Sequence, residues 1–596
     1  MVKNIIPLDE GAGSGKGVSR RDFLKGTAVG AVGVAAAGIL SACENPAASD
    51  GNPDDGIMTG DKANQKWSFE IAPPPITNYE EGGTADVVVV GAGMSGLTTA
   101  LRARQEGASV ILISASSNPI SRGGSNSATH STVMAEAGVP SMNFNDYFNR
   151  EQLAGSYRVD QQKWSKFANH STEAMNWLID LVRAKGIIVA LERDNYEPAL
   201  DRWVVAHGFI PPDLGDGSMS GSGQQSVVEA LAAYCTEAGV TIHYKNIARQ
   251  LVRGTDNATG RVTGVIAETD GKYVKYTGTK GIVLATGDFS GDRDMLAKYC
   301  PWILPIWTQD TYTPPEAIYD KGFAFGDIFP GDGHKMGLWV GAAWQKIYPN
   351  APMIQGNWGG SYQPLGFHQG LVVNVKGERF YNENISSPYS ATLLVNQPQR
   401  RSYGIWTANF AQAVIDNGLK WYAFGDTYDT PERTAAEMIA QWEAGAAAAD
   451  SPYKQYFKAN TLQALCTALG ISYATTQATL NRYNELANAN PPEDRDFFKD
   501  SKLMIPVNPA GPFYAAVNSP LFMTITGGLR TDANMQVCDE NDDPIPGLFN
   551  VGIMVGDVYA NNYNFAIPGH SYGGNCLTFG YVLGSDLAKN RIPANA

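Results

Sequence analysis

The sequence predicts an α/β fold built around a parallel sheet, and three segments indicate it. Asp86–Val90 ends in four consecutive valines, which predict a strand buried on both faces. The amphipathic stretch Leu97–Gly107 and the apolar stretch Ser109–Ile113 follow as a helix and a second strand. Gly281–Leu284 predicts a further buried strand, reached after the alternating, turn-rich stretch Gln250–Lys275. A return to the sheet after such a β-meander is typical of FAD-binding rather than NAD-binding folds.

The turn after the first strand carries glycines at 91, 93 and 96. Gly91 allows a tight turn, Gly93 lets a pyrophosphate approach the backbone, and Gly96 lets helix and strand pack closely. Free N–H groups at the start of the helix then hold the phosphates. Together with its strand and helix, the turn predicts dinucleotide binding, with an ordinary Gly-rich turn as the alternative.

The acid that usually binds the ribose is missing from the end of the second strand. Ser114 stands there, followed by Ala115. A hydroxyl can hydrogen-bond a ribose, although less strongly than a carboxylate.

Charge and length exclude some classes of function. The chain of 596 residues carries 59 acidic and 45 basic side chains. Its length predicts more than one domain, and its acidity argues against a nucleic-acid partner. Five of the cysteines are scattered without a Cys-x-x-Cys motif, which excludes a c-type haem on the chain and predicts no metal site.

The N-terminus predicts export. Arg20-Arg21 lies in a twin-arginine pattern, and the following run Gly26–Leu40 is too short and too rich in Gly and Ala to span a membrane. A disordered basic tail is the alternative. Cys43 ends a stretch that resembles a lipoprotein cleavage box. Residues 1–42 are therefore expected to be the signal, and Cys43 is expected to carry a lipid anchor that holds the protein at the extracytoplasmic face of the membrane. Simple cleavage near Ala42 is the alternative. Residues 43–83 are rich in Pro, Gly, Asn and Asp and predict a linker.

Seven motifs in order resemble the flavoprotein subunit family of fumarate reductase and succinate dehydrogenase, over about residues 84–591. They are Gly91–Gly96, Arg122–Asn126, Ala285–Phe289, Gly331–Gly337, Gly377–Glu383, Pro546–Phe549 and Gly573–Leu577. The resemblance implies a Rossmann-like FAD-binding domain in two sequence pieces, 84–342 and 516–596. It also implies an α+β capping domain, 343–515, inserted between them.

The resemblance also implies which residues contact FAD. They are Gly91, Ala92, Gly93, Met94, Ser95, Gly96, Ser114, Ala115, Gly123, Gly124, Ser125, Asn126, Ala248, Thr286, Gly287, Asp332, Gly552, Gly574, Asn575 and Leu577. Membrane-bound fumarate reductases attach FAD through a His before Thr-Val. Here Ser131 precedes Thr132-Val133 and His130 comes one place early, so non-covalent FAD is expected.

The residues with which the family grips a dicarboxylate are replaced. The family's His and Arg positions correspond to Thr524, Ser571 and Tyr348, and no Arg follows Asn382-Glu383 before Tyr389. Without these cations a dicarboxylate would be poorly paired. The replacements are similar to the 3-ketosteroid dehydrogenase branch, in Gly527–Asp532, Gly511–Tyr514 and Tyr389. The match is partial, because Ile567 stands where that branch has a further catalytic Tyr.

Four side chains are candidates for catalysis, in a reaction that the resemblance implies: hydride transfer from FAD to one carbon of a polarised C=C bond and protonation of the other. Tyr389 is the best proton donor, because a tyrosine hydroxyl of ordinary pKa, about 10, is protonated at neutral pH. Its alternative role is a core aromatic of the cap. His570 and Tyr572 are expected to polarise a substrate carbonyl or to pack against the flavin, and Tyr348 is a further candidate.

Three functions stay open. The first is an exported ene-reductase that takes electrons from a separate membrane cytochrome or quinol-linked donor and reduces a small unsaturated substrate, as a terminal step of anaerobic respiration. The second runs the same chemistry backwards, as a 3-ketosteroid-type dehydrogenase. The third is a flavin electron-relay protein without catalysis.

Overall fold

The computed structural model describes residues 66–192, 204–212, 223–307, 315–321, 328–358, 370–385, 387–421, 427–447, 455–563 and 567–592. The chain divides into two compact units, residues 1–65 and 66–596. The predicted twin-arginine signal and Cys43 fall in the first unit, outside the described residues. In the second unit the first strand begins at Glu80, inside the stretch expected to be a linker.

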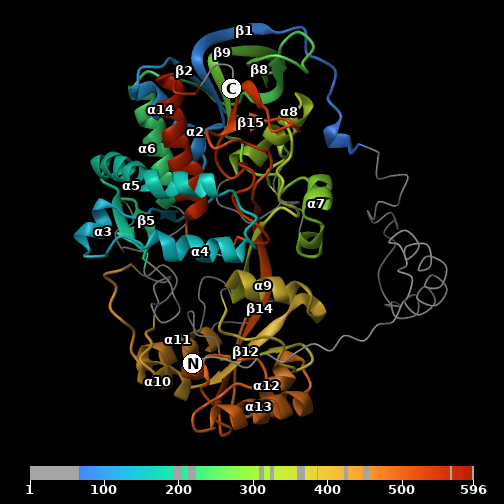
Figure 1. Ribbon diagram of the computed structural model, residues 1–596. Helices are drawn as coiled ribbons and strands as arrows, with labels where there is room; N and C mark the ends of the chain where they lie inside the picture. The colour runs from blue at the N-terminus through green and yellow to red at the C-terminus, as the bar shows by residue number, and fades with distance from the viewer. Residues whose placement is uncertain are drawn as a thin grey trace, which may run out of the picture. The chain divides into compact units, whose positions relative to one another are not determined.

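An eight-stranded sheet confirms the predicted α/β fold (Figure 1). Its parallel pairs join β1 (Glu80–Val90) to β2 (Val110–Ile113) and β9 (Lys272–Leu284), β2 to β6 (Thr241–His243), and β9 to β16 (Pro544–Asn550). Its antiparallel pairs join β7 (Ile247–Arg253) to β8 (Val262–Thr269), β8 to β9, and β15 (Gln536–Cys538) to β16. Because β16 comes from near the end of the chain, the sheet joins two pieces that are distant in sequence.

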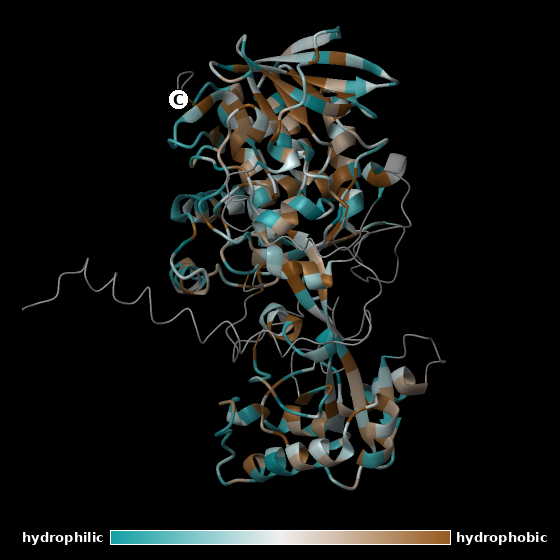
Figure 2. Cartoon of the chain, turned by 90° about the vertical axis from the view of Figure 1, so that its right-hand side faces the viewer, coloured by the Kyte–Doolittle hydropathy of each residue, from teal (hydrophilic) through white to brown (hydrophobic). Residues whose placement is uncertain are grey.

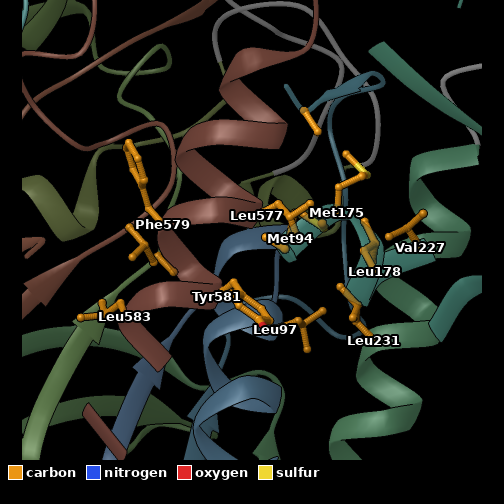
Figure 3. Close-up of a cluster of buried hydrophobic side chains, with 14 of the residues drawn as sticks. Met94, Leu97, Met175, Leu178, Val227, Leu231, Leu577, Phe579, Tyr581 and Leu583 are labelled. Carbon is orange, nitrogen blue, oxygen red and sulfur yellow. The ribbon is translucent and has the colours of Figure 1, made fainter. Parts of the chain in front are cut away.

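The valines of β1 divide between two hydrophobic clusters, as a strand buried on both faces requires. Val87 and Val89 belong to a cluster formed with helices, and Val88 and Val90 to a cluster that includes residues of β7, β8 and α8 (Asp332–Trp339). The helices of the first cluster include α2 (Met94–Gln105), α5 (Gln161–Ala184), α6 (Gly223–Glu237), α14 (Phe579–Ala588) and the π-helix η8 (Ser571–Thr578). Figure 3 shows how side chains from these elements gather.

A separate five-stranded antiparallel sheet lies between residues 352 and 525. Its strands are β10 (Pro352–Trp358), β14 (Phe513–Ile525), β12 (Ser402–Thr407), β11 (Leu371–Asn374) and β13 (Tyr456–Ala459). Its helices are α9 (Ser387–Val395), α10 (Asn409–Asp416), α11 (Ala435–Ala447), α12 (Leu462–Leu469) and α13 (Tyr473–Ala487). Two hydrophobic clusters pack α10 to α13 against β11, β12 and β14, and a third joins α9 to β10 and to the end of β14. The hydrophobic segments of the strands are visible in Figure 2.

A small sheet and short helices complete the described fold. The sheet has the order β3 (Asn126–Ser127), β5 (Ala206–Ile210), β4 (Ile188–Leu191). The helices are α3 (Thr132–Glu136), α4 (Phe144–Ala154), α7 (Arg293–Tyr299) and the 3₁₀ turns η2 (Ser68–Glu70), η4 (Pro301–Ile306), η5 (Pro315–Asp320), η6 (Pro398–Arg400) and η7 (Ser501–Leu503). Over the residues that the structure describes, none of the helices combines the length and the apolar character that crossing a membrane requires.

Candidate FAD site and catalytic residues

The Gly-rich turn between β1 and α2 has the geometry that a pyrophosphate site needs. Gly91 has a φ of 118°, and a side chain there would overlap the carbonyl oxygen of Ala285. A Cβ at Gly96 would overlap the carbonyl oxygen of Gly91, so this glycine lets α2 pack on the turn. At Gly93 the nearest atom to a Cβ would be the Ile120 oxygen, 3.6 Å away. The chain's own packing therefore requires the first and third glycines, while the second leaves room for a group to approach the backbone.

Ser114, at the end of β2, is tied to this turn. Its Oγ accepts a hydrogen bond from the Ala92 amide at 3.3 Å and lies 2.8 Å from Ser116 Oγ. Because Ser116 donates its own hydrogen to the Asn118 oxygen, Ser114 is the donor in the pair of hydroxyls. Its hydroxyl therefore keeps one lone pair for a ribose.

The polar loop 121–127 lies against η8. The ring of Tyr572 fills the space that a side chain at Gly123 would need, and a Cβ at Gly573 would overlap the backbone of Ser127. A side chain at Gly124 would meet nothing within 4 Å. The loop is fixed by Asn126, whose Nδ2 donates to the Gly124 oxygen at 3.1 Å and to Gln224 Oε1.

Ser131, which directly precedes Thr132-Val133, makes its hydrogen bonds within the protein. Its Oγ accepts from the Met134 amide at 3.0 Å, which caps α3, and lies 2.7 Å from His207 Nε2. Since His207 Nδ1 lies 3.0 Å from the Asn126 oxygen, Nδ1 donates there and Nε2 accepts the Ser131 hydrogen. Burial lowers the pKa of His207 to about 4, so the ring is neutral and holds the loop in place.

Further predicted FAD residues lie on several other segments of the fold. Gly552 donates its amide to the Asn575 oxygen at 3.0 Å and comes so close to Ser95 that a side chain would clash. Gly287 has a φ of 84°, and Thr286 Oγ1 closely contacts Gly333, at the start of α8. Asp332, the first residue of α8, accepts a hydrogen bond from Tyr319 at 2.7 Å, and burial raises the pKa of its carboxyl. Ala248 is buried on β7, and Leu577 lies in the core beside Met94 (Figure 3).

Several buried polar atoms along these segments have no hydrogen-bond partner within the described part of the chain. They include Arg122 Nε and Nη1, Asn126 Oδ1 and Asn575 Nδ2. The Arg122 guanidinium lies over the Phe329 ring at 3.7 Å, and burial lowers its pKa only to about 10, so it stays charged at neutral pH. Buried polar groups normally have partners. Donors and acceptors of this kind, beside open glycine backbone, fit a bound FAD.

The four catalytic candidates occupy different surroundings. Tyr389 lies on α9 and is 38% exposed. The start of this helix is held by a hydrogen bond from Asn562 Nδ2 to the Pro388 oxygen at 3.1 Å. Tyr572 lies with its ring on Gly123 and its hydroxyl 3.4 Å from Ser121 Oγ, and burial raises its pKa. Tyr348 is 53% exposed, and its backbone oxygen accepts from Arg158 at 2.9 Å.

His570 is placed in the core. Its ring stacks on Trp164 with 4.2 Å between centroids, and its Nδ1 lies 2.6 Å from the Tyr559 hydroxyl. Burial lowers the pKa of His570 to about 3, so the imidazole is neutral at physiological pH. Its two expected roles, polarising a substrate carbonyl or packing against the flavin, stay predictions.

Two acidic residues were not singled out from the sequence. Asp288 follows β9 and is buried, and it accepts hydrogen bonds from the Thr524 hydroxyl and, at 3.2 Å, from the Ile525 amide. Glu192 follows β4 and hydrogen-bonds to Ser125, and burial raises the pKa of its carboxyl to about 7. An acid in the loop that follows a buried parallel strand is a signal that could have pointed to Asp288, because such strand ends carry sites in α/β folds. No sequence pattern marks Glu192. No cluster of three potential metal ligands occurs among the described residues.

The sequence matches two known families and is similar to characterised reductases. Residues 86–566 match the family described as FAD binding domain, and residues 17–37 match the twin-arginine translocation pathway signal sequence. The vinyl phenol reductase of Lactiplantibacillus plantarum is 25% identical over 540 residues, which cover 85% of this chain and 96% of that protein.

Two solved structures share the fold. The 3-ketosteroid Δ4-(5α)-dehydrogenase of Rhodococcus jostii RHA1 has a TM-score of 0.61 at 21% identity, over 87% of this chain and 99% of that one. A flavocytochrome c3 fumarate reductase in its open conformation has a TM-score of 0.57 at 21% identity, over 86% of this chain and 79% of that one.

Proposed function

The chain belongs to the FAD binding domain family, and from this premise we propose that it reduces an activated C=C bond in a small acceptor that is not a dicarboxylate. The family and the twin-arginine signal make it an exported FAD-dependent oxidoreductase acting on CH–CH groups.

The contact between Thr524 and Asp288 carries the proposal about the acceptor. Thr524 stands where the family has a His of its dicarboxylate clamp, and its hydroxyl donates to a buried acid. A substrate carboxylate at this position would meet an acid in place of a cation, which is unfavourable at low dielectric. An uncharged alkene conjugated to a ketone or an aromatic ring meets no such penalty. The similarity to a vinyl phenol reductase supports an acceptor of this class.

The protein's own residues would position the acceptor and deliver a proton. Bound FAD, which we propose to be non-covalent, supplies the two-electron reduction. Tyr389 is the proposed proton donor, and the contact of Asn562 with the Pro388 oxygen ties its helix to the segment that leads into η8. Tyr572 is proposed to pack beside the flavin loop through Gly123, and His570 to hold η8 through its stack on Trp164. Tyr348 is proposed to line the route to the site because its side chain is exposed.

The proposed electron donor is a separate membrane cytochrome or quinol-linked protein. The twin-arginine signal supports this, because an exported flavoprotein has no ready supply of NADH. We propose that Cys43 carries a lipid anchor, which would keep the enzyme beside that donor.

The proposed domains are residues 84–342 and 516–596 for FAD and 343–515 for the cap. Membership of the two large sheets supports this division, although β14 continues through the second boundary to Ile525. The 3-ketosteroid-type dehydrogenase is the second candidate, supported by Gly511–Tyr514 and Tyr389.

Anaerobic reoxidation of the reduced full-length protein tests the proposal. The flavin absorbance is followed in a stopped-flow instrument after mixing with a vinyl phenol, a cyclic enone, a steroid enone or fumarate. The proposal predicts fast reoxidation by at least one uncharged alkene, with the saturated product formed in equal amount. If none of the alkenes reoxidises the flavin but a saturated ketosteroid reduces the oxidised protein, the dehydrogenase is the correct assignment. If neither reaction occurs, the protein is an electron relay.

A further inference from the structure

The 3₁₀ turn η5 reaches three separate parts of the FAD site through three consecutive residues. The Ile318 oxygen accepts from Arg122 Nη2 at 2.9 Å, in the flavin loop. The Tyr319 hydroxyl donates to Asp332 Oδ2 at 2.7 Å, at the start of α8. Asp320 Oδ1 accepts from the Ser117 amide at 2.5 Å, just beyond the end of β2. Three hydrogen bonds therefore hold η5 against the segments that are predicted to bind the cofactor.

The third of these contacts lies where the fold lacks an acid. In dinucleotide-binding units a carboxylate after the second strand binds the ribose hydroxyls. Here Ser114 holds that position, and its hydrogen is already donated to Ser116 while one lone pair accepts from Ala92. Ser114 can accept one hydrogen bond from a ribose, but it cannot provide a negative charge.

We propose that Asp320 supplies this missing carboxylate from η5 and binds the adenosine ribose of FAD. Its contacts among the described residues use Oδ1 alone, and its side chain is exposed beside Ser117. Oδ2 is then available to a ribose hydroxyl, and a carboxylate accepts such a hydrogen bond more strongly than a neutral oxygen. The inference rests on FAD binding alone and does not depend on which acceptor the enzyme reduces.

A double comparison tests the proposal with the full-length protein. Bound FAD is removed, and FAD or an analogue with a 2′,3′-dideoxyadenosine moiety is titrated back while flavin fluorescence is followed. Asp320→Asn keeps the size of the side chain and an oxygen for the Ser117 amide but removes the charge. The matched control is Asp294→Asn, an exposed acid on α7.

We expect Asp320→Asn to weaken FAD binding about 10- to 100-fold, the range for losing a hydrogen bond to a charged group. The control should bind like the unmodified protein. The analogue should bind the unmodified protein more weakly than FAD, but Asp320→Asn should discriminate much less between the two ligands.

Equal affinities of Asp320→Asn and the unmodified protein for FAD would overturn the proposal. The proposal would also be overturned if replacing FAD by the analogue weakened binding to the same extent in both proteins. Asp320 would then hold only the loop at Ser117. Should Asp320→Asn fail to fold, Asp320→Glu enters the same comparison, since it keeps the charge but displaces it from the ribose. A failure of ene-reductase activity would leave these binding constants unaffected.

Discussion

The hydroxyl of Thr524 donates its hydrogen to the buried carboxyl of Asp288, joining the end of β14 to the loop after β9. The same carboxyl also accepts from Ser290 Oγ at 2.9 Å. Burial raises the pKa of Asp288, while these hydrogen bonds favour its charged form. A buried acid therefore lies directly beside Thr524.

Asp288→Asn should widen the range of acceptors. The amide has nearly the shape of the acid but carries no charge, so a substrate carboxylate near Thr524 would no longer be repelled. We expect the ratio of kcat/KM for an unsaturated carboxylate to that for a cyclic enone to rise about tenfold. Steady-state rates with a reduced viologen dye measure this ratio, with the exposed Asp416→Asn as control. An unchanged ratio would mean that Asp288 does not face the acceptor.

Tyr389→Phe should separate protonation from electron uptake. The ring is kept and only the hydroxyl is lost, so FAD content and reduction of the flavin by the dye should stay normal. Turnover should fall by about 10²–10⁴-fold, the range for removing a general acid. Tyr473→Phe, an exposed tyrosine on α13, is the control. A loss below about tenfold would show that the proton comes from another group, and Tyr572→Phe would be measured next.

His570 should make the protein less stable in acid. Its pKa is about 3 in the folded protein and about 6.5 in an unfolded chain. Between these values the unfolded state binds a proton that the native state does not, so the free energy of unfolding falls as the pH drops. Each such histidine contributes a slope of about 1.4 kcal/mol per pH unit.

Urea unfolding of His570→Gln and of the unmodified protein at several pH values between about 4 and 7 isolates this contribution. The two stabilities should converge as the pH falls, because only the unmodified protein carries the histidine. His170→Gln, a partly exposed position on α5, controls for the loss of a histidine. Parallel pH profiles would contradict the buried neutral imidazole.

Acid precipitation should release FAD into the supernatant. We propose that Ser131 replaces the attaching His, and its hydroxyl caps α3 and contacts His207. Yellow colour that stays in the precipitate would show a covalent link.

The local parts of the fold could be predicted from the sequence, and the long-range parts could not. Val87–Val90 and Gly91–Gly96 specify a buried strand and a tight turn by themselves, because their requirements are met within a few residues. The meeting of Asp288 with Thr524 joins residues 236 apart in sequence. The contact of Asp320 with Ser117 likewise depends on where η5 packs, which no local pattern encodes. The same holds for the contacts of His570 with Trp164 and Tyr559, which its neighbours in sequence do not specify.

The preference of the enzyme for an uncharged alkene over fumarate can be measured directly. Values of kcat/KM for fumarate and for the best vinyl phenol or enone are measured with the same reduced dye and the same preparation of full-length protein. We predict that the uncharged alkene is preferred by at least about 100-fold, because Thr524, Ser571 and Tyr348, which we propose to stand at the positions of the dicarboxylate clamp, include no cation. Turnover of fumarate as fast as that of the best uncharged alkene would show that the acceptor site takes a dicarboxylate, contrary to this prediction.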